Sequence, residues 1–272
     1  MATFEVMFFQ GIVVFCCIFG IGILISAYSR HREKKSPITK TLLILHIYLV
    51  AFIFVSLVST LFHLFDIPVI SGTVTESTFP LGDRVLILCH TFFYQFAVIF
   101  LLCAFNYYYV FTRIVFGGGK SKKWIVIMIF VTIINQVGIS AIILYSLLSV
   151  MSGLPVNYEL VSLGVALMAL LGGLILLAAN CIISIPVFRD SIHLWKRTPK
   201  EDPNKSNALY IGIMALLNIL SIIFTIVDIV LARYGGVAYP TIAFVIAWLC
   251  VPLIIYTAYR GYFSRKSEKK IP

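Results

Sequence analysis

The sequence predicts an all-α, polytopic membrane protein, a single bundle of seven transmembrane helices. Three observations predict this fold. Of the 272 residues, 61% are hydrophobic and 12% are charged, whereas soluble domains average about 45–50% apolar and about 25% charged residues. The apolar residues fall into seven runs, each long enough to cross a hydrocarbon core of about 30 Å as an α-helix. Lys and Arg gather in alternate connections between these runs.

Each apolar run should be a helix, because an unpaired backbone polar group is costly in lipid. The first run is longer than the apolar part of a signal peptide and has no basic segment before it, so we expect it to span. Ser36-Pro37 is a helix-start signal for the second span, and Gly153 with Pro155 marks a turn after the fourth. The expected spans of this single domain are residues 5–28, 39–64, 82–112, 123–149, 158–187, 207–233 and 238–262.

The positions of the basic residues predict the orientation. Of the 21 Lys and Arg residues, only Arg84 and Arg233 lie beside the connections on one side of the bilayer. The others follow the first, third, fifth and seventh spans. Because cytoplasmic loops carry an excess of Lys and Arg, we expect the N-terminus outside, the C-terminus in the cytoplasm and a multi-pass location in the cell membrane. The net charge of +10 is then explained by basic residues that orient the chain in the membrane. The expected partner is the lipid bilayer, and nucleic acid is not expected.

Several functional classes lack the residues that they need. Covalent retinal requires a lysine in the last span, and none lies between Pro240 and Tyr259, which excludes it. The metalloprotease pattern HExxH and the hydrolase pattern GxSxG do not occur, so no catalytic residues and no enzymatic activity are expected. The six cysteines lie in apolar runs with no CxxC spacing, so we expect them to be packing groups. No cofactor and no metal site is expected.

Polar side chains concentrate in the outer half of the predicted bundle. The sixth span carries Asn218, Ser221, Thr225 and Asp228 at helical spacing, which places them on one face. This face should point into the bundle, because lipid penalises a carboxylate, and an ionisable residue at membrane depth indicates a functional site. We therefore expect an outward-opening ligand pocket, formed by His63, Asp66, His90, Tyr94, Thr225 and Asp228.

Structural roles for the same residues stay open. Asp228 could pair with Arg233 or His90 to hold helices together, while Asp66 could be a charge in the interface with water. A metal site made by His63, Asp66, His90 and Asp228 is a further alternative.

The cytoplasmic side offers a candidate contact surface for a signalling protein. We expect it at the end of the third span and in the basic loop after the fifth, with Tyr108, Arg113, Lys196 and Arg197 as contact residues. The alternative is that the tyrosine anchors its helix at the interface and Arg113 extends its charge into the headgroups. The fifth span also has small residues that predict close helix packing, within the bundle or in a homodimer; these are Ser162, Ala166, Ala169, Gly172 and Gly173.

Two short motifs at the C-terminal end resemble parts of known seven-helix proteins. The run Cys250-Val251-Pro252-Leu253-Ile254-Ile255-Tyr256, followed by Phe263 and basic residues, resembles the NPxxY end of rhodopsin-like G-protein-coupled receptors. It lacks the asparagine and has one extra residue before the tyrosine. The run Tyr259-Arg260-Gly261-Tyr262-Phe263 is similar to the exit of the seven-helix sensor region of some prokaryotic histidine kinases. Both resemblances imply a receptor or sensor.

The leading hypothesis is therefore a stand-alone seven-helix receptor or sensor. It would bind an unknown small ligand from the outer side, shift its helices near Pro186 and Pro252 and signal to a cytoplasmic partner. The alternative is a small transporter or channel of the same topology, with His90 and Asp228 carrying protons or cations.

Overall fold

Seven α-helices make up the described part of the chain. The computed structural model describes residues 4–61, 81–115, 123–202, 205–234 and 241–263. All seven helices are long and apolar enough to cross a membrane, so the prediction of an all-helical chain with seven potential spans is confirmed. The helices are α1 Phe4–Glu33, α2 Pro37–Leu61, α3 Leu81–Val115, α4 Lys123–Met151, α5 Tyr158–Arg197, α6 Lys205–Tyr234 and α7 Ile242–Phe263.

Short polar signals fix several helix ends. The Ser36 hydroxyl accepts a hydrogen bond of 3.2 Å from the Thr39 N–H at the start of α2, as the Ser36-Pro37 signal predicted. Asn157 caps α5 in the same way, with a bond of 3.0 Å from the Leu160 N–H. Gly153 follows α4 with a φ of 73°, the left-handed conformation that commonly closes a helix.

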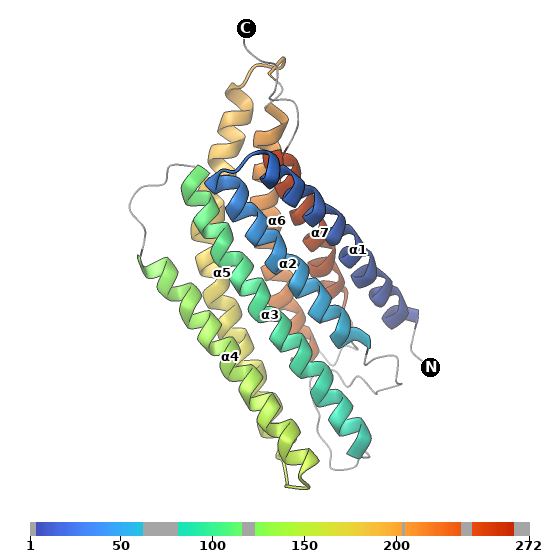
Figure 1. Ribbon diagram of the computed structural model, residues 1–272. Helices are drawn as coiled ribbons and strands as arrows, with labels where there is room; N and C mark the ends of the chain where they lie inside the picture. Colours follow the sequence, from blue (N-terminus) through green and yellow to red (C-terminus); the bar gives the residue numbers. More distant parts are fainter. Residues whose placement is uncertain (1–3, 62–80, 116–122, 203–204, 235–240, 264–272) are drawn as a thin grey trace.

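The helices form a ring in chain order (Figure 1). Each helix packs against its neighbours in the sequence, and α1 closes the ring against α7. Aromatic side chains make this closure: Phe9 of α1 lies 5.1 Å from Phe244 and 5.8 Å from Trp248 of α7, measured between ring centroids. Trp248 in turn stacks on Phe52 of α2 at 5.3 Å. Within the described residues, the backbones of helices that are not neighbours in the ring rarely come close, and such helices meet through side chains.

Side chains on the outer face of the ring are apolar. Ile18, Phe130 and Leu171, on three different helices, are each more than half exposed. Contiguous exposed apolar surface of this kind is unfavourable in water and is expected where lipid is the solvent.

One end of the bundle is basic and extended. The odd-numbered helices terminate there, with basic side chains in their last turns: Arg30, Arg32, Arg113, Lys196, Arg197 and Arg260. We call this the basic end. At this end α5 continues beyond the expected limit at residue 187 to Arg197, and with the start of α6 it projects past the other helices (Figure 1). A helix does not have to end at the membrane surface, so the length of the apolar run underestimated α5.

The small residues of α5 allow close packing inside the bundle. A Cβ atom at Gly172 would lie 2.7 Å from Nδ2 of Asn135 in α4, and one at Gly173 would lie 3.2 Å from Cγ1 of Ile226 in α6. These two glycines therefore let α5 sit tightly between its neighbours.

Candidate ligand-binding cavity

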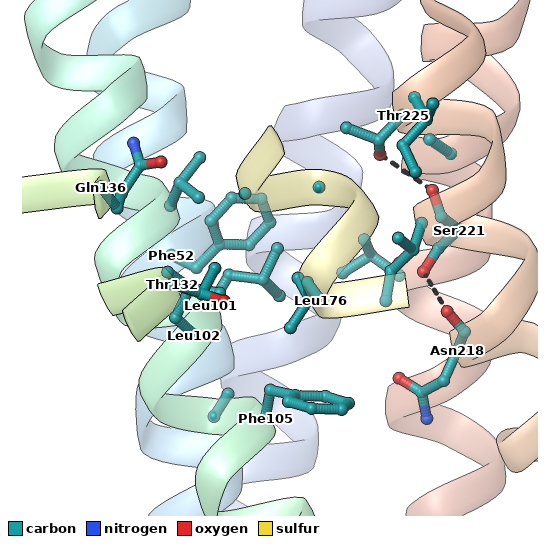
Figure 2. A pocket seen from close by; sticks show the side chains of 18 of the residues that line it. Phe52, Leu101, Leu102, Phe105, Thr132, Gln136, Leu176, Asn218, Ser221 and Thr225 are labelled. Carbon is teal, nitrogen blue, oxygen red and sulfur yellow. Dashed lines mark hydrogen bonds between the residues drawn. The ribbon is translucent and has the colours of Figure 1, made fainter. Parts of the chain in front are cut away.

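A cavity of about 220 Å³ occupies the centre of the ring. Every helix from α2 to α7 contributes to its wall. On α6 the lining residues run from Met214 to Ile229, which corresponds to about 22 Å along a helix. Figure 2 shows apolar side chains of α2, α3 and α5, among them Phe52, Phe105 and Leu176, together with the polar side chains of α6 in its wall. The cavity is thus elongated along the bundle axis and has a mostly apolar wall.

The polar stripe predicted on the sixth span faces this cavity. Asn218, Ser221 and Thr225 all belong to the wall, one above the other along α6 (Figure 2). Each donates a hydrogen bond to a backbone carbonyl of its own helix: Asn218 to Met214 at 3.1 Å, Ser221 to Asn218 at 3.0 Å and Thr225 to Ser221 at 2.8 Å. Because the hydroxyl donors are already used, the hydroxyl oxygens of Ser221 and Thr225 are left as acceptors.

Asp228 continues the stripe and is the single charged side chain among the described lining residues. Its Oδ1 accepts a hydrogen bond of 2.7 Å from the Thr241 hydroxyl. The same hydroxyl accepts a bond of 3.1 Å from the Phe244 N–H, so Thr241 caps the first turn of α7. In the part of the chain that the structure describes, Asp228 makes no ion pair, and the side chain of Arg233 lies outside that part.

Three aromatic rings surround the same end of the cavity. Tyr94 of α3 is close enough to Asp228 for the two groups to interact electrostatically. Its ring centroid lies 5.8 Å from that of Phe244, and Phe244 lies 6.4 Å from Trp248 in an edge-to-face arrangement. All four residues line the cavity. We call Asp228, Tyr94, Phe244 and Trp248 the acidic-aromatic cluster; on α6 it lies toward the end of the helix remote from the basic end.

A buried hydrogen-bond chain lies toward the basic end of the cavity. Tyr108 of α3 lines the cavity, is 3% exposed and bonds to the Ser184 hydroxyl of α5 at 3.2 Å. Ser184 donates to Oδ1 of Asn180 at 2.7 Å, so Tyr108 is the donor in the first bond. Asn180 Nδ2 is buried without a partner among the described atoms. The chain ties α3 to α5 two residues before Pro186, which lies inside α5.

The structure brings together three residues of the expected pocket. Tyr94, Thr225 and Asp228 line the cavity. His90 does not belong to the described wall; its Nδ1 lies 2.8 Å from the Ser59 hydroxyl and 2.9 Å from the Ser59 carbonyl oxygen, which joins α2 to α3. His63 and Asp66 fall outside the described residues.

The alternative in which His90 pairs with Asp228 finds no support among the described contacts, since His90 bonds to Ser59. The alternative of a metal site includes His63 and Asp66, which the structure does not describe. Within the described residues, no three His, Cys, Asp or Glu side chains lie close enough together to hold a metal ion.

The expected cytoplasmic contact residues divide into two groups. Arg113, Lys196 and Arg197 are exposed at the basic end. Tyr108 is a correction: it lies inside the bundle and points to α5, because its hydroxyl finds a buried partner there.

Sequence reasoning missed other residues of the wall. Gln136 of α4 donates to Oε1 of Gln95 in α3 at 2.6 Å. Phe244 and Trp248 gave no signal, because aromatic residues suit lipid and protein interiors equally. Thr241 is not among the described lining residues but bonds to Asp228, which lines the cavity. It did give a signal, since a threonine between a proline and an apolar run is a helix-start signal.

Comparison with known proteins finds no matching protein-family model, no matching curated protein and no matching solved structure. The residues of the cavity are therefore the basis for inferring its function. They form an elongated apolar site with acceptor atoms along one side and a carboxylate with aromatic rings toward one end.

Proposed function

We propose that this chain is a seven-helix receptor or sensor of the cell membrane, and that a small amphipathic ligand occupies its central cavity. The position of the cavity carries this proposal, because its wall draws on every helix from α2 to α7. A ligand at this position touches many helices at once. It therefore shifts the balance between alternative helix arrangements by its differential affinity for them.

The proposed orientation places the basic end in the cytoplasm and the N-terminus outside. The distribution of Lys and Arg supports it. The ligand then enters from the outer side, near the acidic-aromatic cluster. Glycosylation tags test this orientation: a tag at the N-terminus should be modified, whereas a C-terminal tag and the native Asn204-Lys205-Ser206 acceptor should not. Tags modified at both ends would contradict the proposal.

The proposed output is a shift of α5 and α6 at the basic end, read by a cytoplasmic signalling protein. Two features support this route. The Tyr108–Ser184–Asn180 chain lies between the acidic-aromatic cluster and the basic end. Pro186 follows directly and lacks a backbone N–H, so α5 has one helical hydrogen bond fewer at this point. Exposed Lys196 and Arg197 then offer charge to a partner.

A fluorescent amino acid incorporated at position 194 tests the output. Leu194, in the last turns of α5, is 55% exposed, and Leu148, near the other end of the bundle, is exposed to the same extent and serves as the control position. A compound that raises the unfolding temperature of the purified protein should change the emission at Leu194 and leave that at Leu148 unchanged. Stabilisation without a change at Leu194 would count against the sensor.

Flux measurements separate the sensor from the transporter alternative. Protein reconstituted in liposomes should pass neither protons nor the compound that stabilises it. Flux that follows the protein dose and is lost in Asp228→Asn would favour the transporter.

A further inference from the structure

We propose that the ligand of this cavity is an organic ammonium compound, whose cationic nitrogen binds Asp228 under the rings of Tyr94, Phe244 and Trp248. This inference rests on the proposed ligand-binding function and adds the chemical class of the ligand. Charge, aromatic surroundings, hydrogen-bond pattern and cavity size each support it.

The carboxylate of Asp228 in the cavity wall favours a cationic ligand. Asp228 is the single charged group among the described lining residues, and Thr241 supplies its one hydrogen bond within the described structure. A carboxylate at membrane depth is costly unless further donors or a positive charge compensate it. An ammonium group supplies N–H donors and a positive charge together.

The aromatic rings favour an organic cation over a metal ion. A cation within about 6 Å of an aromatic ring centroid is attracted to the ring face. Tyr94, Phe244 and Trp248 line the same cavity as Asp228. Ring contacts of 5.8 Å and 6.4 Å connect Tyr94 to Phe244 and Phe244 to Trp248. Calcium and magnesium ions instead require several oxygen ligands. The described residues assemble no such acidic group around Asp228.

The hydrogen-bond pattern of α6 points to a ligand that donates. Ser221 and Thr225 use their hydroxyl hydrogens on carbonyls of their own helix. Their oxygens therefore accept hydrogen bonds from the cavity, which suits the N–H groups of an ammonium ion. A carboxylate or phosphate would instead meet these acceptors and the charge of Asp228.

The volume of the cavity sets the size of the ligand. An apolar protein cavity of about 150 Å³ accepts a benzene ring. The present cavity of about 220 Å³ therefore has room for one ring and a short aminoalkyl chain. Phe52 and Phe105 lie in the wall and can contact the apolar body while the nitrogen reaches Asp228.

Three compounds with the same skeleton test the proposal: phenethylamine, phenethyl alcohol and phenylacetate carry a cationic, a neutral and an anionic head group. Binding to the purified full-length protein is measured by equilibrium dialysis and by the rise of the unfolding temperature with concentration. The amine should bind about tenfold or more tightly than the alcohol, and phenylacetate should bind most weakly.

Substitutions test whether the acidic-aromatic cluster causes the preference for the amine. Asp228→Asn keeps an oxygen that can accept from Thr241 but removes the charge, so amine affinity should fall about tenfold or more while alcohol affinity stays the same. Trp248→Leu keeps the carboxylate and removes one ring, which should reduce the preference for the amine several-fold. Asp190→Asn is the matched control, because this carboxylate is exposed on α5; it should change none of the three affinities.

Two kinds of failure are distinguishable. Equal affinities for amine and alcohol in the unmodified protein, no binding of any of the three, or unchanged amine binding in folded Asp228→Asn would overturn the ammonium assignment. Ala247→Phe places a ring in the cavity from α7, and Ser221→Leu obstructs it from α6. Undiminished binding of all three compounds to both variants would place the site elsewhere and overturn the proposed cavity function itself.

Discussion

Thr241→Val tests the hydrogen bonds through which Thr241 connects Asp228 of α6 to the start of α7. Thr241 is 1% exposed, and its hydroxyl makes two contacts: it donates to Asp228 at 2.7 Å and accepts from the Phe244 N–H at 3.1 Å. Valine has nearly the same shape and cannot make either hydrogen bond. The substitution therefore removes both polar interactions with little change in packing.

The expected loss of stability follows from these two hydrogen bonds. Removal of a threonine helix cap costs about 0.5–2 kcal/mol. A hydrogen bond to a charged group contributes about 1.5–3 kcal/mol. Because both bonds share the Thr241 oxygen, the two costs are not fully additive, and we expect Thr241→Val to lower the free energy of unfolding by about 2–4 kcal/mol.

Thr257→Val is the matched control on the same helix. Thr257 is 5% exposed and donates only to the carbonyls of Leu253 and Ile254 in its own turn of α7. Its loss should cost less than about 1 kcal/mol, since it connects no second helix and caps no helix end. Reversible unfolding in mixed micelles with increasing SDS gives both free energies. Equal stabilities of the two variants would refute the role assigned to Thr241. In the double variant with Asp228→Asn, a loss smaller than the sum of the two single losses would show the coupling directly.

Two further substitutions test the packing around the cavity in the same SDS assay. Gly172→Ala should lower the free energy of unfolding by about 1–3 kcal/mol, because its Cβ would lie 2.7 Å from Nδ2 of Asn135. Gly164→Ala is the control: a Cβ atom there would meet nothing within 4 Å, so the change should be neutral or stabilising by up to about 1 kcal/mol. The reverse order of stabilities would contradict the packing of α5. Tyr108→Phe should cost about 0.5–1.5 kcal/mol through loss of its bond to Ser184, and stability equal to the unmodified protein would argue against that bond.

The fold was predictable because its signals are local. Seven apolar runs are long enough to span, and each must be helical because backbone groups in lipid have to be paired within the segment. The helix-start signal at Ser36 is equally local and correctly placed the start of α2. The end of α5 at Arg197 was not predictable from apolar length. Its last turns mix charged residues with apolar ones and lie beyond the apolar run, where the need to satisfy backbone groups in lipid no longer determines the conformation.

The orientation of the polar stripe was predictable because a single helix decides it. Thr225 and Asp228 were correctly placed in the interior, since helical spacing and the cost of a carboxylate in lipid orient α6 by themselves. The surroundings of His90 and Tyr108 depend instead on how α3 is rotated against α2 and α5. No periodicity within α3 specifies the serine that each of them meets.

The polar stripe of α6 lies in the wall of the cavity and, in the described part of the chain, does not join helices. Polar residues in membrane helices commonly hold helices together by hydrogen bonds between them, and Ser59, Tyr108 and Gln136 each do so here. Ser221 and Thr225 instead bond to their own helix, so helix association does not explain why they are polar. Their free acceptor oxygens face the cavity, where they improve the solvation of whatever occupies it. Thr112, Ser140 and Thr257 make the same kind of own-helix bond outside the described wall. The position of the stripe in the wall, and not its hydrogen bonding alone, is therefore what supports the proposed ligand site.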